Sequence, residues 1–157
     1  MSAYNEQLQR IWHKYEAEIG RLPATARDAV AWGVQQRLIS PSAIDPLDRL
    51  AEDMARALRE EYRVDQQGRK YRLNHAVRVT KAGVQFTLWA ELDHAPRPHM
   101  EKAFGQRRKQ IVGDCLQLKT DVDVYNDMHS DQPPLQLILD FSDDVAELQG
   151  MDDQEAA

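Results

Sequence analysis

The chain has 157 residues, of which 42% are hydrophobic and 29% charged, and its formal net charge is −6 at pH 7. These values exclude a disordered chain and are typical of one globular domain with a buried core. The apolar runs are too short to cross a membrane, and the N-terminus lacks a signal-peptide pattern, so we expect no membrane partner. The single cysteine, Cys115, excludes an intramolecular disulfide and favours a cytoplasmic location.

The charge is divided unevenly along the sequence. Residues 56–109 carry 13 Lys or Arg against 6 Asp or Glu, which gives this segment a net charge of +7. Residues 110–157 carry 1 basic residue against 12 acidic ones, which gives a net charge of −11. Such asymmetry indicates either a polyanionic partner or the shielding of one surface of the protein by another.

The first half of the chain predicts three helices. Apolar residues at three- and four-residue steps predict a helix over residues 3–21, ended by Gly20. A second helix is predicted from about residue 24 to Leu38, although Gly33 inside it costs ~1 kcal/mol relative to alanine. The third helix is predicted over residues 46–62. Its expected buried face consists of Leu47, Leu50, Met54, Ala57, Leu58 and Tyr62.

A polar turn with Gly68 at its tip is predicted over residues 64–72. Two alternating segments, Asn74–Thr80 and Val84–Leu92, then predict the strands of a hairpin. The short loop Lys81-Ala82-Gly83 joins them, and its glycine is typical of hairpin turns.

The longest helix is predicted over residues 98–128. Residues that alternate at steps of four and three form a heptad seam along it: Phe104, Arg108, Ile111, Cys115, Leu118, Val122 and Tyr125. Such a seam indicates lengthwise packing on another helix. That helix could belong to the same domain or to a second copy in a dimer, and the residues predicted to mediate the interaction are Ile111, Leu118, Val122 and Tyr125.

The chain after the long helix predicts a short strand over residues 135–141 and a turn of helix over 143–148. Residues 150–157 are predicted to be a frayed acidic tail. The fold class is therefore α+β, mainly helical, with a wing-like hairpin and one long helix. We expect a single domain over residues 1–149, with helices and hairpin in 3–92 and the long helix and short strand in 97–149.

Basic residues of the third helix, the turn and the hairpin form the strongest functional signal. They are Arg49, Arg56, Arg59, Arg63, Arg69, Lys70, Arg72, Arg78 and Lys81. A helix followed by a basic hairpin suits duplex DNA, because the helix can enter the major groove while the hairpin contacts phosphates. Alternatively, the arginines of the helix could pair with the neighbouring Asp53 and Glu60, or the basic segment with the acidic C-terminal third.

The order of helix, helix, loop, helix and basic hairpin over residues 3–92 resembles a winged helix-turn-helix domain. In this resemblance the second helix is Ala24–Gly33, the third is Pro46–Tyr62 and the wing is Arg63–Leu92. The resemblance implies a duplex DNA partner. The stretch from Gln106 onward resembles an uncharacterised group of bacterial proteins, which implies a bacterial or phage source.

No motif predicts a catalytic residue, a metal site or a cofactor. His94 and His99 with nearby carboxylates could hold a metal, but we interpret them as solvent-facing loop residues. The segment Asp121–Asp127 begins like a calcium loop, yet Asn126 stands where that loop needs glycine, so we interpret it as helix. Five acidic residues could bind Mg²⁺ in a hydrolase if they converged: Asp114, Asp121, Asp140, Asp143 and Asp144.

The sequence therefore favours a non-enzymatic nucleic-acid-associated protein that binds duplex DNA through its basic helix and hairpin. A protein-interaction module is the alternative, either a dimer through the seam or an acidic surface that mimics DNA. A metal-dependent hydrolase is the second alternative.

Overall fold

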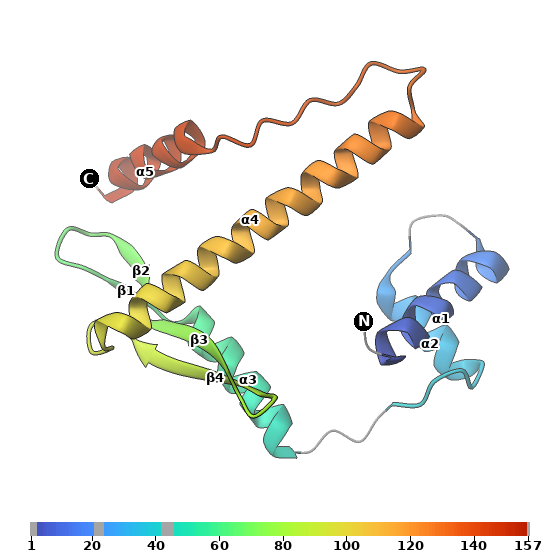
Figure 1. The fold of residues 1–157 in the computed structure, drawn as a ribbon, viewed down its shortest axis with the longest axis horizontal. Coiled ribbons are helices and arrows are strands. Elements are labelled where there is room, and N and C mark those ends of the chain that lie inside the picture. Colours follow the sequence, from blue (N-terminus) through green and yellow to red (C-terminus); the bar gives the residue numbers. More distant parts are fainter. Residues whose placement is uncertain (1–2, 21–23, 42–45, 157) are drawn as a thin grey trace. The chain divides into compact units, whose positions relative to one another are not determined.

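The computed structural model describes residues 3–20, 24–41 and 46–156 (Figure 1). Its helices are α1 Ala3–Ile19, α2 Ala26–Gln35, α3 Pro46–Glu60, α4 Arg97–Met128 and α5 Ser142–Ala156. Its strands are β1 Tyr62–Val64, β2 Lys70–Arg72, β3 Asn74–Lys81 and β4 Val84–Glu91, which form two small antiparallel sheets. The predicted mainly helical α+β fold is confirmed. The chain forms two compact units, Met1–Ala51 and Glu52–Ala157, and the single domain remains a prediction.

In the first unit, α1 packs against α2 around Ile11, which is 5% exposed. The helix α1 ends at Ile19 because Gly20 adopts a φ of +135°. At the start of α2, the Thr25 side chain accepts a hydrogen bond from the Asp28 amide at 3.1 Å. The close approach of the two helices explains Gly33, since a Cβ atom there would lie 2.8 Å from Cγ2 of Ile11.

In the second unit, the predicted polar turn with Gly68 at its tip is present, but it joins two short strands that the sequence did not predict, so that residues 62–72 form the β1–β2 hairpin. The Asp65 side chain organises the loop of this hairpin. It accepts hydrogen bonds from the amides of Gln67 and Arg69 at 2.9 and 2.8 Å, and it also pairs with the Arg69 guanidinium. The hydrogen bond from the Arg69 side chain is the largest cause of a lowered pKa at Asp65. Gly68 supplies the positive φ of the turn.

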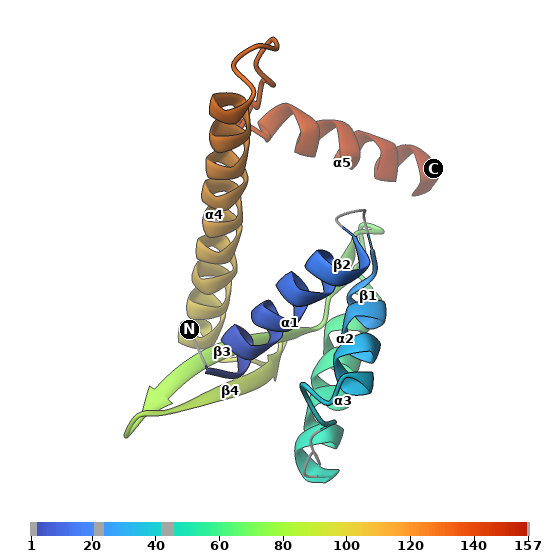
Figure 2. The same ribbon diagram turned by 90° about the vertical axis from the view of Figure 1, so that its right-hand side faces the viewer.

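The second hairpin, β3–β4, is confirmed (Figure 2). Its pairing runs from Asn74 opposite Glu91 to Lys81 opposite Val84, which leaves a loop of Ala82 and Gly83. Both loop residues have positive φ, +51° and +76°, as the tight turn that matches strand twist requires.

The long helix α4 is confirmed, and it begins directly after Pro96. Near its N-terminus it packs on β3, where Ala103 is fully buried. The ring of Phe104 lies edge-on to the buried His75 ring, with centroids 5.4 Å apart. Figure 1 shows that the C-terminal part of α4 extends well past the hairpin.

Two predicted apolar faces are not buried. On α3, Leu47, Leu50 and Met54 are exposed, whereas the hydrogen bond from Asn74 joins β3 to the end of the helix at Leu58. Within the second unit, the predicted packing of the α4 seam on another helix is not seen either, since Ile111 and Leu118 are exposed among the described residues.

The predicted strand over 135–141 is wrong, because these residues pair with no strand in the described chain. The backbone of Leu135 instead exchanges two hydrogen bonds with the side chain of Asn126. The prediction of a frayed tail is also wrong for residues 150–156, which belong to α5. Asp140 accepts a hydrogen bond from the Ser142 amide at 3.1 Å, and this bond lowers the pKa of Asp140 and favours the start of α5.

Substituting Gly33 tests the close approach of α1 and α2. We expect Gly33→Ala to lower the free energy of unfolding by about 1–2 kcal/mol, because the branched Ile11 side chain cannot yield easily. Gly113→Ala in α4 is the matched control, since open space surrounds that position. It should raise the free energy of unfolding by up to about 1 kcal/mol through helix propensity alone. Urea denaturation of each variant would measure both effects, and a stabilised Gly33→Ala would contradict the packing.

Substituting Ala82 tests the turn of the second hairpin. Asparagine adopts positive φ more easily than alanine, so we expect Ala82→Asn to raise the free energy of unfolding by about 1 kcal/mol. Gly83→Ala should lower it by a similar amount. Urea denaturation of the two variants gives the comparison, and changes of the same sign would show that the turn has another geometry.

Candidate nucleic-acid interface

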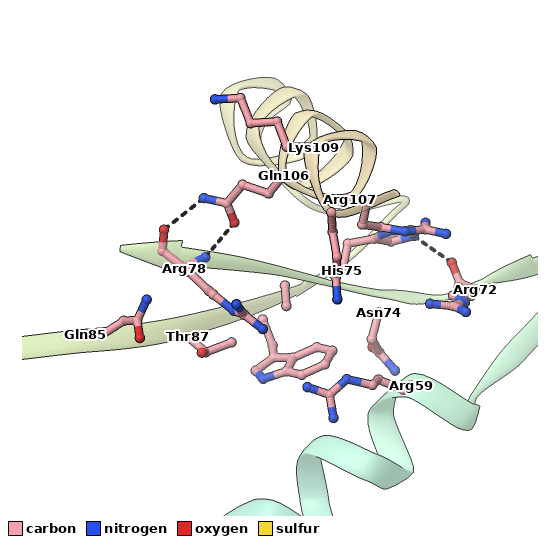
Figure 3. A pocket seen from close by; sticks show the side chains of 13 residues that line it. Arg59, Arg72, Asn74, His75, Arg78, Gln85, Thr87, Gln106, Arg107 and Lys109 are labelled. Carbon is pink, nitrogen blue, oxygen red and sulfur yellow. Dashed lines mark hydrogen bonds between the residues drawn. The ribbon is translucent and has the colours of Figure 1, made fainter. Parts of the chain in front are cut away.

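The second unit contains a hollow of about 670 Å³ between α3, the β3–β4 hairpin and α4 (Figure 3). Its lining residues are Arg59, Arg72, Asn74, His75, Ala76, Arg78, Gln85, Thr87, Trp89, Gln106, Arg107, Lys109 and Gln110. No carboxylate is among them. Because five of the side chains are permanently cationic, the hollow is a strongly basic surface, which we call the basic hollow.

The five cations come from four different elements. They are Arg59 of α3, Arg72 of β2, Arg78 of β3, and Arg107 and Lys109 of α4. None of the five forms an ion pair within the described residues. Cations from distant parts of the sequence therefore meet at one place without a local counter-charge.

Strand pleating places the floor of the basic hollow. Ala76 pairs with Trp89 and Arg78 with Thr87 across the hairpin, and paired residues of antiparallel strands share one face. The Arg59 guanidinium lies over the Trp89 ring, 5.4 Å from its centroid. This cation–π contact orients Arg59 toward the sheet.

The Asn74 side chain fixes α3 beside this floor. Its amide donates to the Leu58 carbonyl at 3.2 Å and to Oε1 of Glu61 at 2.9 Å. The Leu73 amide also donates to the Glu61 carbonyl at 3.1 Å. The end of α3, and with it Arg59, is therefore tied to the start of β3.

Gln106 fixes α4 on the other side of the basic hollow. Its Oε1 accepts from the Arg78 amide at 2.8 Å, and its Nε2 donates to the Arg78 carbonyl at 2.9 Å. Figure 3 shows this pair of bonds between the helix and the strand. Arg107 and Lys109 follow Gln106 by one and three residues, so the same contact brings both cations to the basic hollow.

His75 lies at the base of the basic hollow and is 4% exposed. Its Nε2 bonds to the Arg72 carbonyl at 2.8 Å, and because a carbonyl only accepts, the ring donates there. Burial is the main reason why the pKa of His75 lies below its ordinary value of 6.5, and the charges of Arg107 and Arg72 lower that pKa further. A neutral His75 therefore keeps the base of the hollow free of a sixth positive charge.

The structure brings together three of the nine predicted DNA contacts, Arg59, Arg72 and Arg78. Three others form local ion pairs: Arg56 with Asp53, Arg63 with Glu61, and Arg69 with Asp65. The ammonium of Lys70 lies over the Tyr62 ring, and Lys81 is exposed at the tip of the second hairpin. Arg49 belongs to the first unit.

Arg49, Arg56 and Arg63 recur every seven residues in the sequence, but they do not share one helical face. The helix α3 ends at Glu60, so Arg63 lies in β1. The sequence prediction also omitted Arg107, Lys109 and Trp89 from the site. The two cations belong to a visible basic cluster at the start of the long helix, but nothing in the sequence indicates that this cluster faces the hairpin.

The acidic C-terminal third does not neutralise the basic segment through ion pairs in the described chain. Lys119 pairs with Asp123 four residues away, and Arg97 pairs with Glu101. A second hollow separates Arg69 and Lys70 of the first hairpin from α5, whose Asp152 and Glu155 line its far side. No ion pair crosses that hollow in the part of the chain that the structure describes.

The structure does not assemble the acidic site considered for a hydrolase. Among the described residues, the one group of three potential metal ligands is Glu91, Asp93 and His94, all of them exposed. His99 lies elsewhere, with its Nε2 2.9 Å from the His75 carbonyl oxygen. Cys115 is half-buried on α4.

Comparisons with protein-family models, with curated proteins and with solved structures find no match to this chain. The winged helix-turn-helix resemblance therefore remains a prediction. No helix among the described residues has the length and apolar character needed to cross a membrane.

The buried His75 predicts a pH dependence of stability. Its folded-state pKa lies below 6.5, so the unfolded chain binds more protons than the folded chain as the pH falls through 6.5. We therefore expect the free energy of unfolding to decrease from pH 7.5 to 5.5, and His75→Gln to remove part of that decrease. Urea denaturation across this range checks the difference between the two proteins. His94→Gln, at an exposed side chain, is the control, and an equal effect of both substitutions would contradict the assignment.

Proposed function

We propose that this protein is a non-enzymatic nucleic-acid-binding protein that holds backbone phosphates of duplex DNA in the basic hollow. The observation that supports the proposal is the meeting of five unpaired cations from four elements, with no carboxylate in the lining. Like charges held together raise the free energy of the unliganded protein, and a bound polyanion lowers it. Arginine, which supplies four of the five cations, is the residue best suited to bidentate phosphate contacts.

The neutral lining residues also fit this role. Gln85, Thr87 and Gln110 offer amide and hydroxyl groups, which commonly contact phosphate and sugar oxygens. The overall charge of −6 does not oppose the proposal, because binding depends on the local field of a surface.

The second hairpin suits a duplex better than an isolated phosphate. Its strands are 8 residues long, and its exposed tip carries Lys81. Arg78 lies on the same hairpin, about 10 Å from the tip at the rise of a β-strand. A double helix seated at the basic hollow could therefore contact the hairpin along its length, as a wing contacts a neighbouring groove or phosphate row.

Titration of a fluorescent duplex with the protein tests the proposal. Five phosphate contacts predict a slope of about −4 to −5 in a plot of log K against log salt concentration. The double variant Arg78→Ala/Arg107→Ala should reduce the magnitude of that slope by about 2. It should weaken binding at low salt by at least about tenfold, and fluorescence anisotropy at about 50 and 200 mM salt measures both changes.

Arg97→Ala/Lys119→Ala is the matched control, because it removes the same charge from residues that already form ion pairs outside the basic hollow. Its binding should stay within about twofold of the parent protein. Equal losses in the two double variants would mean that only overall charge matters, and no binding at low salt would overturn the proposal.

A further inference from the structure

Within the second unit, α4 leaves its apolar seam uncovered beyond its contact with β3. Ile111, Leu118 and Tyr125 are 56%, 46% and 45% exposed, and Cys115 and Val122 between them are half-buried. The helix has 32 residues and is therefore about 48 Å long, of which only the N-terminal part packs on the hairpin. A heptad seam of this length matches the surface by which two helices pack side by side.

The charges of α4 are polarised along its axis. Two ion pairs, Arg97–Glu101 and Lys119–Asp123, are internal to the helix. The remaining cations all lie in its N-terminal half: Lys102, Arg107, Arg108 and Lys109. The remaining anions all lie in its C-terminal half: Asp114, Asp121 and Asp127. This polarity makes the helix complementary to a second α4 that runs in the opposite direction.

We infer that two copies of this protein associate through their α4 seams in antiparallel orientation. A parallel pair would place four cations beside four cations and three anions beside three anions, which destabilises it. An antiparallel pair places the cationic half of each helix beside the anionic half of the other.

The seam also matches itself when one copy is reversed. If Arg108 faces Tyr125 of the second copy, then Ile111 faces Val122 and Cys115 faces Leu118. Each layer then pairs a residue at heptad position a of one helix with a residue at position d of the other, as antiparallel helix pairs require. The Arg108 layer is consistent with this match, because a guanidinium against a tyrosine ring forms a favourable cation–π contact.

The seam lies next to the face of α4 that lines the basic hollow. The helix faces the hairpin through Ala103 and Gln106, whereas Ile111 and Leu118 lie about a quarter turn around the axis from Ala103. Arg107 lies between the two surfaces, about 20° from Leu118 and about 40° from Ile111 around the axis, so it borders both the basic hollow and the seam. The inference does not depend on the proposed function.

Sedimentation equilibrium at about 5–200 μM protein tests the association. We expect a mass of twice the 18.1 kDa chain. Leu118→Glu should raise the dimer dissociation constant at least about tenfold, because it places a charge in the seam. Leu116→Glu is the matched control, since Leu116 is 66% exposed and lies off the seam, and it should stay dimeric. Circular dichroism of both variants verifies that the helix content is unchanged.

Distances between spin labels test the orientation. One label is attached at Lys102→Cys and, in a second protein, at Asp127→Cys, each in a Cys115→Ala background. Antiparallel helices in the stated register place the two Lys102→Cys labels about 40 Å apart and the two Asp127→Cys labels about 30 Å apart. Parallel helices place both pairs within about 20 Å.

The inference is supported by a dimer whose label distances are about 40 and 30 Å and which Leu118→Glu dissociates but Leu116→Glu does not. A monomer throughout the concentration range would overturn it, including the case in which the first unit of the same chain covers the seam. Short label distances would overturn the antiparallel orientation.

Discussion

In the second unit, the Gln106 side chain forms the hydrogen bonds that a neighbouring strand would otherwise form along the open edge of β3. Gln106 exchanges two hydrogen bonds with the backbone amide and carbonyl of Arg78, on the edge of β3 that β4 does not occupy. A hairpin of two strands is marginally stable by itself in water. The amide of Gln106 satisfies the open edge, and the fully buried Ala103 lets the helix backbone approach the sheet closely. Together with the bond between His99 and the His75 carbonyl, this contact sets the course of α4 over β3.

The basic hollow follows from that crossing and from the opposite anchor at Asn74. The two contacts hold α4 and the end of α3 on either side of one strand face, and Arg107 and Arg59 belong to these two helices. Concentrating cations in this way raises the free energy of the folded state. The neutral His75 limits the cost at the base, because burial and the neighbouring guanidinium groups both oppose its protonation. An anion bound among these cations would lower that free energy.

The sequence predicted those elements of the fold whose signal lies within one short stretch of the chain. The long helix and the second hairpin were predicted to within about a residue or two at each end. The apolar periodicity of the helix and the Gly-containing loop of the hairpin both lie within the segments that they predict. The β1–β2 hairpin was missed because its strands have only three residues and its loop depends on the bonds of one side chain, Asp65. The segment 135–141 alternates like a strand, but alternation specifies a face and not a pairing partner.

The same limit applies to the site. Arg59, Arg72 and Arg78 were predicted because they follow one another along a basic stretch of the chain. Arg107 and Lys109 were not, because their place at the hollow depends on a contact between residues 28 positions apart, Gln106 and Arg78. Sequence patterning identifies the helix that carries them, whereas the direction in which that helix crosses the sheet is a property of the fold.

The periodicity of α4 separates its two surfaces from each other. The stripe that meets the sheet contains His99, Ala103 and Gln106, and the first seam residue, Phe104, still contacts His75, so the seam leaves the sheet only from Ile111 onward. Two stripes on one helix leave it without a single apolar side, so burial of the first does not bury the second. Arg107 and Arg108 show the result, since these adjacent cations lie about 100° apart around the axis. Arg107 lines the basic hollow, whereas Arg108 belongs to the seam.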